Sequence, residues 1–92
     1  MNAKRKGNRD EHRRKAILEA AGYAVTRAAG SLGAWDLIGV SATDMVLVQV
    51  KSNRPLAPAE RESLKLFPCP LNCKRLVHVW LDRQRWPRVT EL

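Results

Sequence analysis

Residues 35–51, WDLIGVSATDMVLVQVK, decide the fold of this chain. Two apolar runs, residues 35–40 and 45–51, flank the short polar segment SATD. Apolar runs of this length around a few polar residues predict an antiparallel hairpin with a four-residue loop. In that hairpin Val40 pairs with Met45, and every step back along the first strand matches a step forward along the second.

The same register predicts a polar patch where the hairpin strands end. It places Asp36 opposite Gln49, with Cβ atoms about 4.5–5.5 Å apart. Because side chains alternate along a strand, Gln49 and Lys51 share one face, while Val48 and Val50 point to the other. The hairpin therefore gathers a carboxylate, an amide and an amine, and a register slip of one residue would scatter them.

The rest of the chain predicts two helices and three more strands. The first helix is expected at residues 8–21, ended by Gly22, whose lack of a Cβ suits a left-handed cap. The second is expected at residues 59–67, after Pro58 in its first turn. The predicted strands cover residues 23–28, 35–40, 45–51, 75–83 and 88–92. We predict an α/β fold with a mixed five-stranded sheet flanked by helices, in the order α-β-β-β-α-β-β, as one domain over residues 1–92.

The charge balance indicates an anionic partner. The chain carries 17 Lys and Arg against 9 Asp and Glu, a formal net charge of +8. Such an excess on a small domain favours nucleic acid before a membrane. The alternative is a basic surface without a partner, or a ribosome-associated protein.

The sequence predicts an intracellular protein. No segment approaches the roughly 18–20 continuous apolar residues of a membrane span, and no signal-peptide pattern follows the charged N-terminus. Cys69 and Cys73 are expected to be reduced, structural thiols. No second cysteine pair follows them and His78 is the nearest histidine, which disfavours zinc. We expect a cytoplasmic location.

The patch suits metal-assisted hydrolysis of a phosphodiester. Asp36 is a hard anionic ligand for Mg²⁺, and the amide oxygen of Gln49 is a neutral one. Lys51 can orient a water molecule or stabilise charge on the phosphate oxygens. Glu11, on the core-facing side of the first helix, could supply a second carboxylate. The pattern leaves an alternative open, in which Asp36 caps a loop and the other two are solvated.

The motifs together resemble a known family. Glu11, Asp36 and Gln49-Val-Lys51 occur with Arg5-Lys6-Gly7 and Arg27-Ala-Ala-Gly-Ser31. In order and spacing they resemble the PD-(D/E)xK nucleases, and within them the archaeal-type Holliday junction resolvases and their small phage relatives. The resemblance implies a restriction-endonuclease-like core that binds a divalent metal, Mg²⁺ with Mn²⁺ able to substitute. It also implies that the cell is prokaryotic or phage-infected.

The resemblance also assigns roles to residues. It implies that Asp36, Gln49 and Glu11 place the metal and that Lys51 assists catalysis. It implies that Arg27, Ser31 and a basic N-terminal arm over residues 1–7, through Arg5 and Lys6, contact DNA. If Glu11 lies at the metal, we further expect Arg14 and Lys15, which follow it on the first helix, to hold DNA phosphates. The alternative is a solvated basic face.

The sequence departs from the family pattern at two positions, and only the change at Gln49, a metal ligand in that pattern, leaves other functions open. Gln49 stands where the family has an acidic residue, and Trp35 stands where proline often precedes the aspartate. The expected activity is metal-dependent, structure-selective cleavage of branched DNA by a homodimer, since two symmetric cuts need two sites. The alternatives are a weak or inactive nucleic-acid-binding module on the same fold, or a nicking nuclease acting on flaps or mismatches.

Overall fold

The structure is a computed structural model that describes residues 3–28, 33 and 35–92, and for residues 3–11 the helix backbone only. The described elements follow the predicted order α-β-β-β-α-β-β. They are α1 (Ala3–Ala20), β1 (Ala24–Arg27), β2 (Leu37–Val40), β3 (Met45–Ser52), α2 (Pro58–Lys65), β4 (Cys73–Trp80) and β5 (Arg88–Glu91). The predicted α/β fold class is confirmed.

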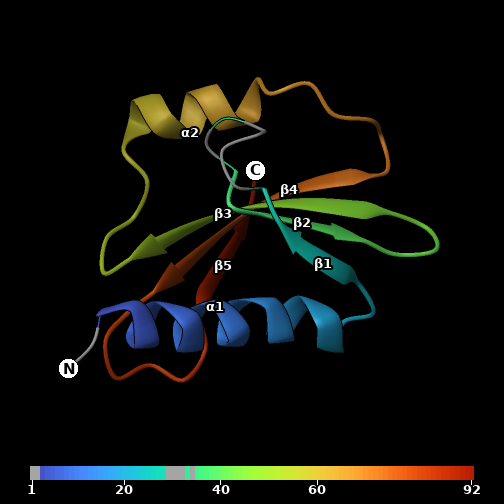
Figure 1. Cartoon of the computed structure of the whole chain (residues 1–92). Helices are drawn as coiled ribbons and strands as arrows, with labels where there is room; N and C mark the ends of the chain where they lie inside the picture. The colour runs from blue at the N-terminus through green and yellow to red at the C-terminus, as the bar shows by residue number, and fades with distance from the viewer. Residues whose placement is uncertain (1–2, 29–32, 34) are drawn as a thin grey trace.

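The described strands form one five-stranded sheet in the order β1-β2-β3-β4-β5. β3 and β4 run parallel, and every other neighbouring pair is antiparallel. A parallel pair needs a crossover connection, which α2 supplies. Figure 1 shows α1 and α2 on opposite sides of the sheet, so the strands are covered from both faces.

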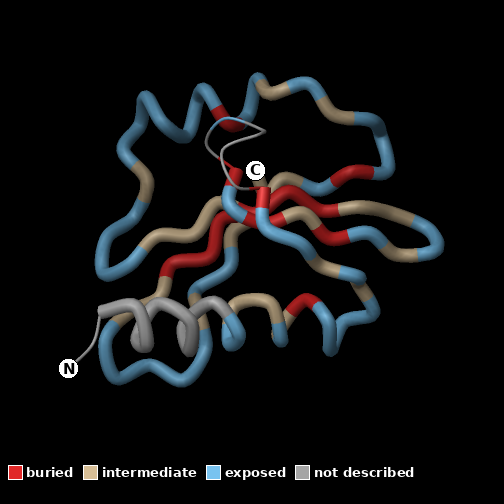
Figure 2. The backbone as a smooth tube through the Cα atoms, viewed as in Figure 1, coloured by how far each residue is buried: buried red, intermediate tan, exposed pale blue. Residues whose placement is uncertain are grey.

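Two apolar clusters hold the layers together. Under α1, Leu18 packs with Leu37, Val46 and Val48. Under α2, Leu64 packs with Leu47, Trp35, Val77 and Val79. The buried positions of Figure 2 follow the central strands, as expected for a sheet covered on both faces.

The first helix starts earlier than predicted. The prediction placed a separate basic arm at residues 1–7, but α1 begins at Ala3, so residues 3–7 continue the helix. Lys and Arg are good helix formers, and a single glycine in a helix costs only about 1 kcal/mol. At the other end Gly22 has φ of 100°, and the Tyr23 N–H donates to Leu18 O at 3.1 Å, which confirms the predicted glycine cap. No helix in the described part of the chain is both long and apolar enough to cross a membrane.

The β2–β3 hairpin has the predicted register. Val40 pairs with Met45, and the ladder continues to Leu37 and Val48. The loop is closed by Asp44, whose carboxylate accepts hydrogen bonds from Ser41 Oγ at 2.5 Å and the Tyr23 hydroxyl at 2.6 Å. These hydrogen bonds lower the pKa of Asp44, and the one from Ser41 has the larger effect. The hydrogen bonds of this loop therefore stabilise the strand register on which the polar patch depends.

Candidate functional site

Gln49 and Lys51 lie on the sheet face that α2 covers. Leu47, two residues before Gln49, packs in the cluster of Leu64 from α2, whereas Val48 packs in the cluster under α1. Strand alternation carries the α2 face from Leu47 to Gln49 and Lys51. The predicted sharing of one face by these two polar residues therefore agrees with the structure.

Asp36 meets β3 beside Gln49, but not as a regular ladder partner. The ladder ends at Leu37, and the Asp36 N–H donates to Val48 O at 2.8 Å instead of to Gln49. Its carboxylate Oδ2 accepts the Val50 N–H at 2.7 Å. Asp36 is therefore bonded to β3 on both sides of Gln49. The prediction that Asp36 pairs directly opposite Gln49 needs this correction.

The break in the ladder has a packing cause. Trp35 is 1% exposed and belongs to the cluster under α2, whereas Leu37 belongs to the cluster under α1. Two residues that flank a regular strand position would share a face, so the alternation must break at Asp36. The Trp35 ring meets Phe67 edge-on, with ring centroids 5.8 Å apart. Burial of this tryptophan thus fixes the backbone that presents Asp36.

Lys51 is paired with a residue that the sequence prediction missed. Its Nζ lies 2.6 Å from Oε2 of Glu60 on α2, and the Lys51 side chain is only 13% exposed. Oε1 of Glu60 accepts the Ala57 N–H at 3.1 Å at the start of the same helix. The hydrogen bond from Lys51, followed by that from Ala57, lowers the pKa of Glu60. The carboxylate of Glu60 therefore links the start of α2 to the amine of Lys51 on β3.

A sequence signal for Glu60 exists, but it indicates only the local contact. A Glu three residues after the N-cap position, with Pro58 at the helix start, predicts a carboxylate that bonds the first turn of a helix. The contact with Lys51 depends on where α2 crosses β3, which local spacing does not specify.

The donor atoms near β3 suit a hard metal ion. Among the described residues, Oε1 of Gln49 is buried and has no hydrogen-bond partner. A buried carbonyl oxygen without a donor is costly, and a cation would satisfy it. No group of three His, Cys, Asp or Glu side chains suited to a metal occurs in the described part, so a metal site there needs the amide oxygen of Gln49. The described candidate ligands are therefore Asp36 and Gln49.

Several predicted residues fall outside the described side chains. Glu11, Arg5 and Lys6 lie on α1, where only the helix backbone is described. Ser31 lies outside the described residues altogether. Glu11 sits one helical turn before Arg14, whose Nη2 donates to Ser52 Oγ at 3.2 Å. That turn of α1 therefore runs beside the end of β3.

The remaining predicted contacts lie at separate places. Lys15 follows Arg14 on α1 and is half-buried. Arg27 is the last residue of β1, pairs with Leu37 and is exposed. Arg27 thus lies next to the segment that carries Asp36, on the strand beside it.

The two cysteines are free and form part of the packing. Cys73 is buried, and burial together with the neighbouring Cys69 raises its pKa to about 12. Cys69 Sγ donates to Cys73 O at 3.5 Å. A thiol with such a pKa is inert at neutral pH, in agreement with the predicted structural role.

Comparison with known proteins places this fold and site in context. The sequence profile of the archaeal Holliday junction resolvase (Hjc) family matches residues 2–65. Among solved structures, the chain is similar to Hjc of Archaeoglobus fulgidus, described as a Holliday junction resolvase from an archaeal hyperthermophile. The two are 26% identical with a TM-score of 0.70, over 94% of this chain and 72% of that one. A search of curated proteins found no match. The residues matched by the family profile contain Asp36, Gln49, Lys51 and Glu60.

Proposed function

This chain belongs to the archaeal Holliday junction resolvase (Hjc) family, of the PD-(D/E)xK type, and shares its restriction-endonuclease-like fold. From that premise we propose that it is a metal-dependent endonuclease that hydrolyses phosphodiester bonds in branched DNA. The net charge of +8 supports a DNA partner. We expect it to act as a homodimer, because symmetric cleavage of a junction requires two sites.

The main observation behind the proposal is the attachment of Asp36 to β3 on either side of Gln49. Two contacts, to Val48 O and from the Val50 N–H, hold this aspartate against β3 on either side of Gln49, whose amide oxygen is buried. In the proposed site Asp36 and Gln49 hold Mg²⁺, Glu11 completes the ligand set, and Mn²⁺ can replace Mg²⁺. The ion would supply Lewis-acid activation of water and neutralise charge on the phosphate.

Lys51 supplies the positive side chain of the proposed site. Its ammonium group can donate to the attacking water or to a phosphate oxygen on which charge develops. The carboxylate of Glu60 restricts the ammonium to one position, which lowers the entropy cost of orienting it for the reaction. Glu60 would therefore act as a positioning residue for Lys51. In this proposal Arg27, on the strand beside Asp36, contacts DNA.

Asp36→Asn and Asp36→Ala test the proposal. Removing the negative charge should lower cleavage of a four-way junction in Mg²⁺ roughly 100-fold or more, as expected when a transition-state charge contact is lost. The Asn variant keeps an oxygen that can accept the Val50 N–H, so it separates loss of charge from loss of structure. Initial cleavage rates and junction affinity in EDTA are the measurements. Wild-type cleavage rates in either variant would contradict the assignment.

A second function has one observation in its favour. Gln49 lacks the charge that the family motif carries, so a binding module without cleavage fits the same fold. Absence of junction cleavage by the wild type in both Mg²⁺ and Mn²⁺, with tight junction binding retained, would support that function. A panel of junction, flap and mismatch substrates separates a resolvase from a nicking nuclease.

A further inference from the structure

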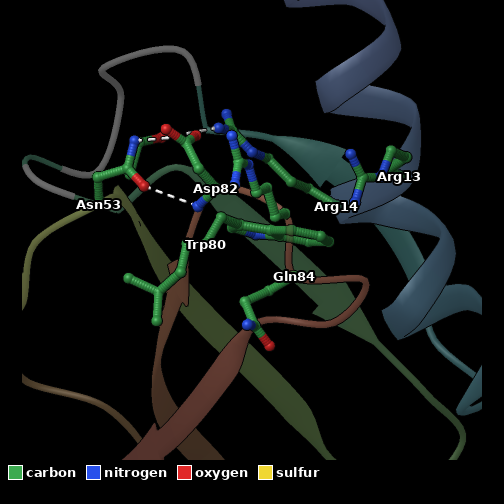
Figure 3. A pocket seen from close by; sticks show the side chains of 9 residues that line it. Arg13, Arg14, Asn53, Trp80, Asp82 and Gln84 are labelled. Carbon is green, nitrogen blue, oxygen red and sulfur yellow. Dashed lines mark hydrogen bonds between the residues drawn. The ribbon is translucent and has the colours of Figure 1, made fainter.

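A polar pocket lies where β3 and β4 end and the second half of α1 passes. Its volume is about 220 Å³. We call it the strand-end pocket, and Figure 3 shows its side chains. It is lined by Arg13 and Arg14 of α1, by Ser52 and Asn53 after β3, and by the segment from Trp80 to Gln84 after β4.

One wall of the strand-end pocket is preformed. Asn53 Nδ2 donates to Asp82 Oδ1 at 3.2 Å, and the Asp82 N–H returns a bond to Asn53 Oδ1 at 2.8 Å (Figure 3). The Asn53 N–H also donates to Trp80 O at 2.7 Å. Asn53 and Arg83 are the two non-glycine residues of the described chain with positive φ, 62° and 65°. Such backbone is unfavourable for arginine, and strained positions of this kind cluster at ligand-binding sites.

The opposite wall presents guanidinium groups that lack a counter-ion. Arg14 donates to the neutral Ser52 Oγ at 3.2 Å. Arg13 donates to Arg85 O at 3.4 Å and stacks over the Trp80 ring, with Cζ 4.9 Å from the centroid. Within the described side chains, neither arginine forms an ion pair with Asp82 or another carboxylate. A guanidinium has five N–H donors, so most of them remain available to a ligand.

Hydrogen-bond donors outnumber acceptors in this pocket. The acceptor atoms Asn53 Oδ1 and Asp82 Oδ1 are already used in the reciprocal pair. Trp80 adds a buried Nε1–H that has no acceptor among the described residues. Its charged lining residues are three arginines and one aspartate. A ligand that accepts several hydrogen bonds and carries negative charge is the complement of this surface.

We propose that the strand-end pocket binds a phosphodiester group of the substrate DNA, one next to the phosphate that is cleaved. Ser52 directly follows Lys51, and the two point to opposite faces of β3, so a strand passing the end of the sheet can reach both. Arg14 and Arg83 grip the phosphate from opposite walls, and the Asn53–Asp82 pair keeps those walls apart. This inference rests on the proposed function, because it takes DNA as the ligand.

Salt-dependent binding tests the pocket. In an Asp36→Asn background with EDTA, Arg14→Gln and Arg83→Gln should each weaken binding of a four-way junction about tenfold. Each should also lower the slope of log affinity against log salt by about one, since one phosphate contact is lost. Lys65→Gln removes one charge from the last turn of α2 and should change neither. Thermal unfolding of all variants checks that they remain folded.

The Trp80 indole signal identifies the ligand. This N–H should shift in NMR spectra on titration with junction DNA, and the shift should vanish in Arg14→Gln. Inorganic phosphate should produce a smaller shift at much higher concentration. The proposal that this pocket binds the DNA backbone is wrong if DNA leaves the Trp80 N–H signal unchanged, whether or not inorganic phosphate shifts it. Equal affinities and salt slopes for Arg14→Gln, Arg83→Gln and Lys65→Gln would overturn it as well.

Failure of this inference can be distinguished from failure of the proposed function. Binding is measured without metal and in a cleavage-deficient background, whereas the function is tested by cleavage with the wild type. If the wild type cleaves junctions but the arginine variants bind DNA as tightly as their background, the pocket proposal is wrong and the nuclease proposal stands. If the wild type binds DNA through the pocket but cleaves no substrate, the result supports the function of a binding module without cleavage.

Discussion

At the scale of single residues, Gln49 holds the most informative atom of the site. Its Oε1 is buried without a donor in the described part of the chain, a condition that costs about 1–3 kcal/mol. Asp36 is bonded to the backbone of β3 on either side of Gln49, so in the proposed metal site the two residues act together. A glutamate there would gain affinity for a cation but would place two negative charges side by side in the metal-free protein.

Gln49→Glu should therefore raise metal affinity and lower metal-free stability. The added charge is expected to tighten Mn²⁺ binding about tenfold, measured by calorimetry, because charge count sets the affinity of such sites. In EDTA the Tm should fall by a few degrees, since burial and Asp36 both disfavour the new carboxylate. Excess Mn²⁺ should recover the difference.

The matched control is Gln84→Glu, the same change at an exposed position after β4. It should leave Mn²⁺ affinity and Tm near wild-type values. If Gln49→Glu binds Mn²⁺ no more tightly than this control, residue 49 does not ligate the metal.

At the scale of elements, α2 completes the site as well as making the crossover. The helix needs a carboxylate at its third position to bond the Ala57 N–H, and Glu60 provides it. Leu64, one turn later, is 4% exposed and sets the depth at which the helix packs on the sheet. The same packing brings the other oxygen of Glu60 to Lys51.

Glu60→Gln should reduce turnover more than DNA binding. Gln can still accept one hydrogen bond, but it no longer holds the ammonium of Lys51 electrostatically. We expect kcat for junction cleavage to fall roughly 10- to 100-fold, as for a displaced catalytic group, with little change in KM. The NMR signal of the Lys51 ammonium, protected by this ion pair, should broaden or disappear.

Glu62→Gln provides the comparison for Glu60, because it removes the same charge from an exposed position on the same helix. Its kcat and the Lys51 signal should match the wild type. If both variants behave alike, the Lys51–Glu60 contact has no part in catalysis.

At the scale of the whole molecule, the central sheet contains a buried titratable group. His78 lies on β4 between Val50 of β3 and Val89 of β5, and is 1% exposed. Burial lowers its pKa from the ordinary value of 6.5. Its Nδ1 has no partner among the described residues, so nothing there favours the charged form.

The stability of the protein should therefore fall as the pH drops below about 6.5. Above that pH His78 is neutral in both states and contributes no pH dependence. Below it the unfolded chain binds a proton that the folded chain resists, by up to about 1.4 kcal/mol per pH unit. His78→Gln should flatten the decline in Tm between pH 7 and pH 5, whereas His12→Gln, at an exposed position, should not. An unchanged slope in His78→Gln would mean that the histidine titrates freely in the fold.

Asp44 and Glu60 do not obscure that window. Hydrogen bonds lower the pKa values of Asp44 and Glu60 below their ordinary values of 3.8 and 4.5. Their contribution is present at higher pH and is lost only as the pH falls through those lower values. Between pH 7 and pH 5, of these three groups only His78 changes its protonation on unfolding.

Features that depend on local spacing could be predicted from the amino-acid sequence. The period of two in residues 45–51, the four-residue loop before Met45 and Gly22 at the helix end predicted the hairpin register, the shared face of Gln49 and Lys51, and the cap of α1. These features follow from the backbone geometry of neighbouring residues, which the spacing of apolar, polar and glycine residues indicates directly.

The contacts between distant segments could not be predicted from local sequence and became visible only in the tertiary structure. Burial of Trp35 under α2 breaks the ladder at Asp36, and the path of that helix brings Glu60 to Lys51. The turns after β3 and β4 likewise meet through Asn53 and Asp82, far apart in the sequence. Such contacts depend on how whole layers pack to bury apolar surface, a property of the complete fold that no short stretch encodes.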